Sequence, residues 1–297
     1  MLMLAPICLF TYNRPDETYQ TVEALKRNSL AASSQLFIFI DSPKNETNTD
    51  KVNRVRQYVK TIDGFKTVEI FESSINNGLA NSIIDGVTLI IKKYGRVIVL
   101  EDDMISSPNF LDFMNQALNF YQYNNKIFSI SGYTMDLPSL IKNKKDYYLS
   151  YRASSWGWAT WLDRWLYIDW SANEYKSFKW NLMKQFTFMR GGSDLPYMLM
   201  KQMNGKIDSW AIRWAFHQFI NDQLTIYPTE SKIYNIGLGD NSTHTKTGSH
   251  FNPNNFITSK LNKFNFDNSP SIDKNISQEF RHVFSVYSRI KNKILKT

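Results

Sequence analysis

The chain has 297 residues, 42% hydrophobic and 21% charged, a balance typical of folded globular proteins rather than disordered or fibrous ones. Its formal net charge is +8 and its single cysteine is Cys8, which excludes a disulfide framework and a cysteine metal cluster and suggests a reducing compartment. The apolar start MLMLAPICLFTYNRP lacks the basic leader of a signal peptide and is shorter than the roughly 20 residues that span a bilayer, so we expect a cytoplasmic protein.

The position of the positive charge argues against a nucleic-acid partner. Lys and Arg are concentrated in the C-terminal stretch SRIKNKILKT. No RNA-recognition, KH, zinc-finger or helix-turn-helix pattern accompanies the aromatic residues. We therefore expect no nucleic-acid binding, and instead attraction to an anionic membrane, with the protein cytoplasmic or peripheral on the inner face of the cell membrane.

Strand-like and helix-like segments alternate through the first hundred residues. Apolar runs predict buried strands at 6–13, 35–41, 67–73 and 96–103, and 3.6-residue periodicity predicts helices at 14–28, 50–62 and 79–95. This alternation predicts an α/β fold with a parallel sheet covered by helices on both faces. Ligands of such sheets bind beyond the carboxyl ends of the strands. Asn13, Asp41 and the triplet Glu101, Asp102 and Asp103 all fall at such ends.

The pattern loosens in the second half of the chain. We predict helices at 107–124 and 208–221, a strand at 127–133, and a Trp-rich turn entering a helix at 153–165. The expected organisation is one domain over 1–248, with a nucleotide-binding half at about 1–107 and an acceptor half at about 108–248. A loosely packed basic extension with a helix is expected over 249–297.

Three consecutive carboxylates close the predicted strand at 96–103. Their mutual repulsion destabilises the fold unless a positive charge lies there, and Mg²⁺ or Mn²⁺ typically binds one or two protein carboxylates together with substrate phosphates. The alternative is a solvated acidic loop, with Ser106, Ser107 and Pro108 starting the next helix without a metal.

Four segments together resemble nucleotide-sugar glycosyltransferases of the GT-A fold. They are FTYNRP, FIFIDSP, NNGLANSI and VIVLEDDMISSPNFLDFM. The last is similar to the acidic motif of animal N-acetylglucosaminyltransferase I, and residues 5–245 as a whole resemble bacterial family-two-like transferases of surface-polysaccharide synthesis. The resemblance implies a mostly parallel Rossmann-like sheet and a metal-dependent, inverting transfer from a UDP-sugar to a saccharide or lipid-linked saccharide acceptor, with Mn²⁺ or Mg²⁺ as cofactor.

The resemblance also assigns roles to residues at the strand ends. The DXD-type motif of these transferases matches the acidic triplet. The match implies that Asp103 contacts the metal and that Glu101 and Asp102 approach the ribose or sugar. The other implied nucleotide contacts are Thr11, Asn13, Arg14, Asp41, Asn77, Gly78 and Ala80. Two of these segments have simpler explanations, since Arg14-Pro15-Asp16 is a reasonable helix start and Asn76-Asn77-Gly78 is a strong turn signal.

An inverting transfer also needs a base for the acceptor hydroxyl. The resemblance places an acidic residue before a helix in the second half, and Asp208 in GKIDSWAIRW matches it. A helix N-terminus favours the ionised carboxylate. The alternative is that Asp208 only caps the helix that follows.

Closely spaced tryptophans and a glycine in SSWGWATW suggest a sugar-binding surface, because aromatic rings stack on the apolar faces of sugars. We assign Trp156, Gly157 and Trp158 to the donor-sugar and acceptor pocket, as the resemblance also implies. Trp161 and Trp165, spaced as neighbours on a helix face, are assigned to the core.

The histidines and the tail carry weaker signals. In the bacterial transferases that the chain resembles, a glycine-rich loop ends in histidine, which makes His244 a candidate metal ligand or diphosphate contact. His217 and His282 are assigned no function. In the tail, Val283, Phe284, Tyr287, Ile290 and Ile294 share one face of a predicted basic helix. Such a helix either binds anionic lipid or docks on its own domain.

Two other functions fit parts of the sequence. A sugar-nucleotidyltransferase also uses a doubly wound sheet and a metal, but FTYNRPDE lacks its usual glycine-rich basic loop. A non-catalytic carbohydrate-binding or scaffold protein on a transferase fold is the other alternative.

Overall fold

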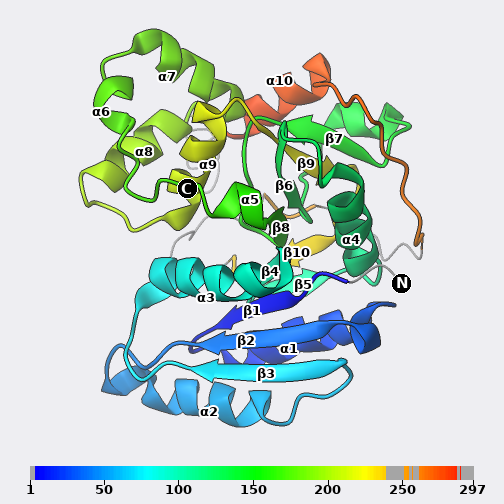
Figure 1. Cartoon of the computed structure of the whole chain (residues 1–297), viewed down its shortest axis with the longest axis vertical. Helices are drawn as coiled ribbons and strands as arrows, with labels where there is room; N and C mark the ends of the chain where they lie inside the picture. Colours follow the sequence, from blue (N-terminus) through cyan, green and yellow to red (C-terminus); the bar gives the residue numbers. More distant parts are fainter. Residues whose placement is uncertain (1–3, 239–250, 254–255, 257–260, 286–287, 289–297) are drawn as a thin grey trace.

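The computed structural model describes residues 4–238, 251–253, 256, 261–285 and 288. Within this part of the chain, an eight-stranded mixed sheet lies at the centre, in the order β3-β2-β1-β4-β8-β6-β9-β7 (Figure 1). Four of its seven strand pairings are parallel. Helices flank the sheet on both sides, so the predicted α/β class with a mostly parallel sheet is confirmed.

The first four strands are all parallel to one another. They are β1 (Ile7–Thr11), β2 (Gln35–Ile40), β3 (Thr67–Glu72) and β4 (Arg96–Glu101). The connecting helices are α1 (Pro15–Lys26), α2 (Thr49–Val59) and α3 (Gly78–Tyr94). Helix α1 starts with proline, and α3 ends at Gly95 in the left-handed conformation, which are favoured residues at these two positions.

The helices cover opposite faces of these strands. Side chains of α1 and α2, including Val22 and Val55, pack in one core cluster with Leu9 of β1. Side chains of α3, including Val87, pack in the other with Cys8. The chain therefore changes faces when α3 carries it from β3 past β2 and β1 to β4 (Figure 1). In sheets of this type a ligand crevice opens where the strand order reverses, which here is between β1 and β4.

The second half adds mixed strands to the far side of β4. These are β6 (Ile127–Ser131), β7 (Tyr147–Ser150), β8 (Trp158–Trp161) and β9 (Leu224–Pro228), with helix α4 (Phe110–Tyr121) over them and the short helix α5 (Leu162–Trp165) after β8. Two short strands, β5 (Met104–Ser106) and β10 (Ile233–Asn235), form a separate antiparallel pair. Short 3-10 turns lie at Ala31–Ser33, Glu46–Asn48, Pro138–Lys142 and Met189–Gly191.

The prediction for 153–165 was partly wrong. Trp158–Trp161 is a strand, β8, inserted antiparallel between β4 and β6, and only Leu162–Trp165 is helical. Trp161 therefore does not share a helix face with Trp165. Both side chains are nevertheless buried in the core.

Four helices form a cluster at one end of the sheet, at the left of the view in Figure 1. They are α6 (Tyr175–Phe178), α7 (Leu182–Phe188), α8 (Leu195–Met203) and α9 (Trp210–Ile220). Their shared core contains Phe178, Phe188, Leu199 and Phe216. Only α9 was predicted from the sequence; we call the segment α6–α8 the helical cap.

The described part of the C-terminal segment packs on the rest of the chain. Helix α10 (Lys274–Val283) begins earlier than predicted, and its Phe280 contacts Tyr148 and Tyr227. Ser139 donates two hydrogen bonds to Glu279. This favours docking on its own domain for the described residues, while Tyr287, Ile290 and Ile294 lie outside them. None of the described helices combines the length and apolar character needed to cross a membrane.

Candidate active site

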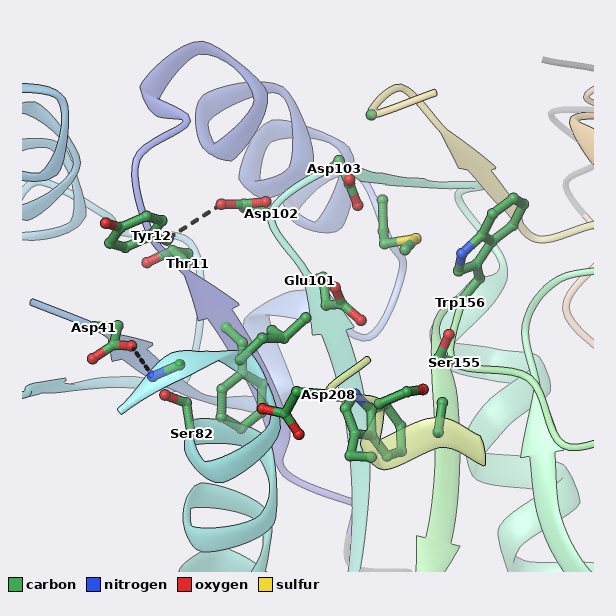
Figure 2. A pocket seen from close by; sticks show the side chains of 18 of the residues that line it. Thr11, Tyr12, Asp41, Ser82, Glu101, Asp102, Asp103, Ser155, Trp156 and Asp208 are labelled. Carbon is green, nitrogen blue, oxygen red and sulfur yellow. Dashed lines mark hydrogen bonds between the residues drawn. The ribbon is translucent and has the colours of Figure 1, made fainter. Parts of the chain in front are cut away.

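A cavity of about 1430 Å³ opens at the carboxyl ends of β1, β2 and β4. Its other walls come from the start of α3, the loop before β8, and helices α8 and α9 (Figure 2). The strand-end residues gathered by the sequence pattern line it together: Thr11, Asn13, Arg14, Asp41, Glu101, Asp102 and Asp103. The crevice expected between β1 and β4 is thus part of this cavity.

The acidic triplet is held tightly at the end of β4. Tyr12 N–H donates to Asp102 Oδ2 at 3.2 Å, and Arg14 Nη1 donates to Asp103 Oδ2 at 2.6 Å. The remaining oxygen of Asp103, Oδ1, is buried and has no hydrogen-bond partner among the described residues. A buried carboxylate oxygen without a partner is unfavourable, because nothing replaces the water that it has lost.

The three carboxyl groups are also difficult to ionise together. Burial, followed by the charge of Asp103, raises the pKa of Glu101 to about 8 and that of Asp102 to about 7. Burial raises the pKa of Asp103 as well, although Arg14 acts in the opposite direction. Arg14 therefore compensates only part of the negative charge. A further cation at this place would stabilise the ionised cluster.

Gly237 packs directly against this cluster and was not singled out in the sequence. A Cβ atom on Gly237 would lie 1.9 Å from Asp103 Oδ2 and 2.9 Å from Arg14 Nη1. The approach is produced by the pairing of β10 with β5 and by a hydrogen bond from Ile236 N–H to the Asp103 carbonyl. The glycine-containing stretch NIGLGD could have drawn attention to Gly237, but Asp103, which Gly237 approaches, lies 134 residues earlier in the chain.

Asp41 faces the cavity while holding the start of α3. Its Oδ1 accepts from the backbone N–H of Asn77 at 2.9 Å, and its Oδ2 accepts from that of Gly78 at 2.9 Å (Figure 2). Gly78 has φ +74°, a conformation that favours glycine. Helix and turn formation therefore account for these contacts without a ligand, and the predicted nucleotide contacts remain a prediction.

Ala80 is placed differently from the sequence prediction. It is buried in the core beneath α3, among Ile83, Val87 and Phe10, and it does not line the cavity. The reason is the helical period, which turns the third residue of α3 toward the sheet. The assignment of Ala80 as a nucleotide contact is therefore wrong for its side chain.

The residues at the end of β1 are held by contacts with β2 and with the 3-10 turn Glu46–Asn48. Thr11 Oγ1 donates to the Phe39 carbonyl at 3.4 Å, and Asn13 Nδ2 donates to Asn48 Oδ1 at 2.7 Å. Both residues line the cavity. The structure therefore brings Thr11, Asn13 and Arg14 together beside the acidic triplet, and the nucleotide contacts that the resemblance implies for them remain a prediction.

The Trp-rich segment divides between the cavity and the core. Trp156 lines the cavity and packs edge-on against Tyr133, with ring centroids 4.5 Å apart. Trp158 is buried and packs on Trp214 and Trp210 at centroid distances of 4.5 and 5.2 Å. Side chains alternate along a strand, so the start of β8 turns Trp158 inward, and its assignment to the sugar pocket is wrong.

Gly157 lies behind the cavity rather than in its lining. It has φ +57°, and a Cβ there would approach Ile233 Cγ1 to 2.6 Å. Its carbonyl accepts a hydrogen bond from Gly132 N–H. Gly157 is therefore required by close backbone packing, which corrects its assignment to the sugar pocket.

Asp208 lines the opposite wall of the cavity, at the start of α9 (Figure 2). Its side chain is 68% exposed and reaches Arg213 Nη2 at 3.4 Å. The helix cap is Ser209, whose side chain accepts from Ile212 N–H, so the alternative that Asp208 caps α9 is wrong. The carboxylate is left open to a ligand in the cavity.

The acidic triplet suits a divalent cation that takes few of its ligands from the protein. No group of three or more His, Cys, Asp or Glu side chains suited to a metal occurs among the described residues, and His244 lies outside them. The unpartnered Asp103 Oδ1 within an anionic cluster nevertheless suits Mg²⁺ or Mn²⁺, which commonly bind only one or two protein carboxylates and take substrate phosphates as further ligands.

Comparisons with known proteins give low similarity. No protein-family model and no curated protein matches the chain. Among solved structures, S. aureus TarS 1–349 gives a TM-score of 0.43 at 9% identity, covering 79% of this chain and 61% of that one. A mannosyltransferase from Pyrobaculum calidifontis in complex with GDP-Man and Mn²⁺ gives a TM-score of 0.38 at 9% identity, and the match covers 54% of this chain and 45% of that one. The galactosyltransferase LgtC gives a TM-score of 0.36 at 8% identity, and the match covers 72% of this chain and 70% of that one.

Proposed function

We propose that the chain is a GT-A glycosyltransferase that moves a sugar from a UDP-sugar to a saccharide acceptor with inversion, using Mn²⁺ or Mg²⁺. The observation that carries this proposal is the acidic triplet beside the β1–β4 crevice, in which Asp102 and Asp103 are buried and Asp103 Oδ1 is unpartnered. A protein that keeps such a cluster of carboxylates at a cavity gains from a ligand that brings positive charge to them.

The cavity is large enough for a donor and an acceptor together. Its volume of about 1430 Å³ exceeds the roughly 300–1,000 Å³ of a typical small-ligand pocket. We assign the nucleotide to the strand ends, where Thr11, Asn13 and Asp41 offer hydrogen-bonding groups. The ring of Trp156 is assigned to a sugar face on the other side of the acidic triplet.

Asp103 is the residue that would hold the cation, and Asp102 is assigned to the ribose or sugar. When bound, the cation stabilises the negative charge that develops on the departing diphosphate. Arg14 orients Asp103 through the 2.6 Å hydrogen bond to Oδ2 and leaves Oδ1 for the ligand. Tyr12 N–H orients Asp102 in the same way.

Asp208 is the proposed general base. It lies across the cavity from the acidic triplet, and its carboxylate is exposed to the cavity rather than engaged by the helix terminus. It would accept the proton of the acceptor hydroxyl as the new glycosidic bond forms. The nucleoside diphosphate leaves from the opposite side of the anomeric carbon, which gives inversion.

The proposed acceptor and the proposed cellular location both rest on the resemblance to bacterial transferases. We assign the acceptor to the saccharides, or lipid-linked saccharides, of bacterial surface-polysaccharide synthesis. The reaction would take place in the cytoplasm, at or near the inner face of the membrane.

The test is metal-dependent release of UDP. Purified protein is incubated with UDP-, GDP- and dTDP-sugars, with and without MnCl₂, and nucleoside diphosphate release and the thermal midpoint are measured. We expect the wild type and Asp50→Asn, a change on an exposed residue of α2 outside the cavity, to respond to UDP-sugar and Mn²⁺ alike, and Asp103→Ala to lose the response. Pyrophosphate release from UTP and a sugar phosphate would instead identify a nucleotidyltransferase.

A further inference from the structure

The helical cap exposes a compact set of large apolar side chains. Four of the seven residues from 180 to 186 are both apolar and exposed: Trp180 (79%), Leu182 (68%), Met183 (75%) and Phe186 (63%). They lie at the junction of α6 and α7, at the outer corner of the cap in Figure 1. We call these four residues the apolar edge. Clusters of this kind on a surface commonly mark an interaction site.

The apolar edge is not a displaced part of the core. The same segment buries Phe178 and Phe188, which pack edge-on with ring centroids 5.7 Å apart inside the cap. The core positions of α6 and α7 are therefore already filled by other side chains. Trp180 and Phe186 are left outside a complete core, which points to a partner beyond the described chain.

The charges around the apolar edge are mostly positive. Residues 174–206 contain six basic residues, Lys176, Lys179, Lys184, Arg190, Lys201 and Lys206, and two acidic residues, Glu174 and Asp194. Asp194 is buried and forms two hydrogen bonds with Arg152, so Glu174 is the acidic residue of this range that is exposed. Lys176, Lys179 and Lys184 are exposed beside the apolar edge.

We propose that the apolar edge and its lysines dock the protein on an anionic lipid bilayer. Exposed Trp, Leu, Met and Phe enter the boundary between headgroups and acyl chains, while the lysines contact lipid phosphates. This combination suits a bilayer better than a protein partner, because protein interfaces are depleted in lysine. Docking requires no catalytic step and does not depend on the proposed transferase activity.

Docking in this way brings the cavity close to the bilayer. Helix α8, in the same cap, contributes Leu195, Met198 and Lys201 to the cavity wall, and its Tyr197 and Met200 are exposed. One wall of the cavity is therefore built by a helix of the same cap that carries the apolar edge. A substrate anchored in the membrane would reach the cavity along this wall.

The test is co-sedimentation of the full chain with vesicles of phosphatidylglycerol or of phosphatidylcholine. We expect binding to the first and weak binding to the second. The double variant Trp180→Ser/Phe186→Ser should lower the partition coefficient on phosphatidylglycerol by roughly tenfold or more, since two large apolar side chains no longer enter the bilayer. The matched control Tyr123→Ser/Ile141→Ser changes two residues that are each 88% exposed elsewhere and should bind like the wild type.

Two further measurements separate the apolar edge from other basic regions of the chain. Brominated lipids should quench tryptophan fluorescence in the wild type, and Trp180→Phe should keep binding but lose most of the quenching. Lys176→Gln/Lys179→Gln/Lys184→Gln should remove most of the preference for phosphatidylglycerol. The proposal is overturned if Trp180→Ser/Phe186→Ser binds as tightly as the wild type, or if these two changes only abolish self-association in solution without affecting vesicles.

Discussion

Two carboxylates face the same cavity in very different surroundings. The Asp103 side chain is 12% exposed, its Oδ2 accepts a hydrogen bond from Arg14, and its Oδ1 is buried without a partner. Asp208 is 68% exposed, and its ion pair with Arg213 Nη2 is long, at 3.4 Å. A buried carboxylate needs a lasting positive charge beside it, whereas an exposed one can take up and release a proton with solvent. The comparison therefore supports the proposed roles, charge stabilisation for Asp103 and proton transfer for Asp208.

The largest effect is expected from Asp103→Asn. The change keeps the shape of the side chain but removes the charge proposed to hold the cation, so kcat should fall on the order of 10³-fold or more, with loss of metal-dependent UDP binding. Steady-state kinetics and calorimetry with MnCl₂ and UDP measure both. If Asp103→Asn retains Mn²⁺-dependent transfer, the role given to the buried carboxylate is incorrect.

Asp208→Asn should separate chemistry from binding. Loss of a general base lowers kcat by about 10²-fold or more, whereas calorimetric Kd values for UDP and Mn²⁺ should stay unchanged, because Asp208 is contributed by the segment before α9 and not by the strand ends assigned to the nucleotide and the cation. Asp163→Asn, a change on an exposed residue outside the cavity lining, serves as control. Full transfer rates in Asp208→Asn would rule out this residue as the base.

Gly237→Ala should disturb the buried Asp103 carboxylate and the Arg14 side chain bonded to it. The added Cβ would lie 1.9 Å from Asp103 Oδ2, so the carboxylate or the β10 segment must shift, and metal affinity should fall by about 10- to 100-fold. Gly95→Ala is the matched control, because it introduces a strained positive φ with nothing within 4 Å of the new Cβ. It should cost stability while leaving the Mn²⁺ affinity intact; equal affinities in wild type and Gly237→Ala would contradict the close approach.

The smallest effect is expected in the pH dependence of stability without metal. The pKa values of Glu101 and Asp102, about 8 and about 7, lie above their ordinary values of 4.5 and 3.8. The folded state therefore holds protons that the unfolded state has lost, and the free energy of unfolding should fall as pH rises from about 4 to about 8. Urea unfolding in EDTA across this range measures the slope.

A variant of the acidic triplet tests the origin of that slope. Glu101→Gln should make the slope shallower, because one ionisable group with a raised pKa is removed. Stability that rises with pH over this window in the wild type would show that the buried cluster is compensated in some other way.

The first hundred residues were predicted well because their signals are local. Each strand is a short apolar run, each helix shows a 3.6-residue apolar period, and proline and glycine mark the start of α1 and the end of α3. The rule that parallel strands expose their carboxyl ends at one edge then brought Asn13, Asp41 and Asp103 to one cavity. Asp208, chosen by resemblance, also lies there.

The second half was predicted less well because its structure depends on distant partners. Strand β8 is short and rich in tryptophan, and it forms only because β4 and β6 pair with it on both sides. The short helices of the cap were not predicted, since each is stabilised mainly by the shared core around Phe178 and Phe216.

Local pattern was sufficient to predict the parallel strands, their connecting helices and the edge at which the carboxylates meet, because backbone periodicity and strand direction act over neighbouring residues. The inward turn of Trp158 and Ala80, the packing of Gly237 on Asp103, and the exposure of Trp180 were decided by contacts between segments far apart in the chain. Whether a side chain enters a core or a cavity depends on which segment packs opposite it, and that is a property of the folded molecule.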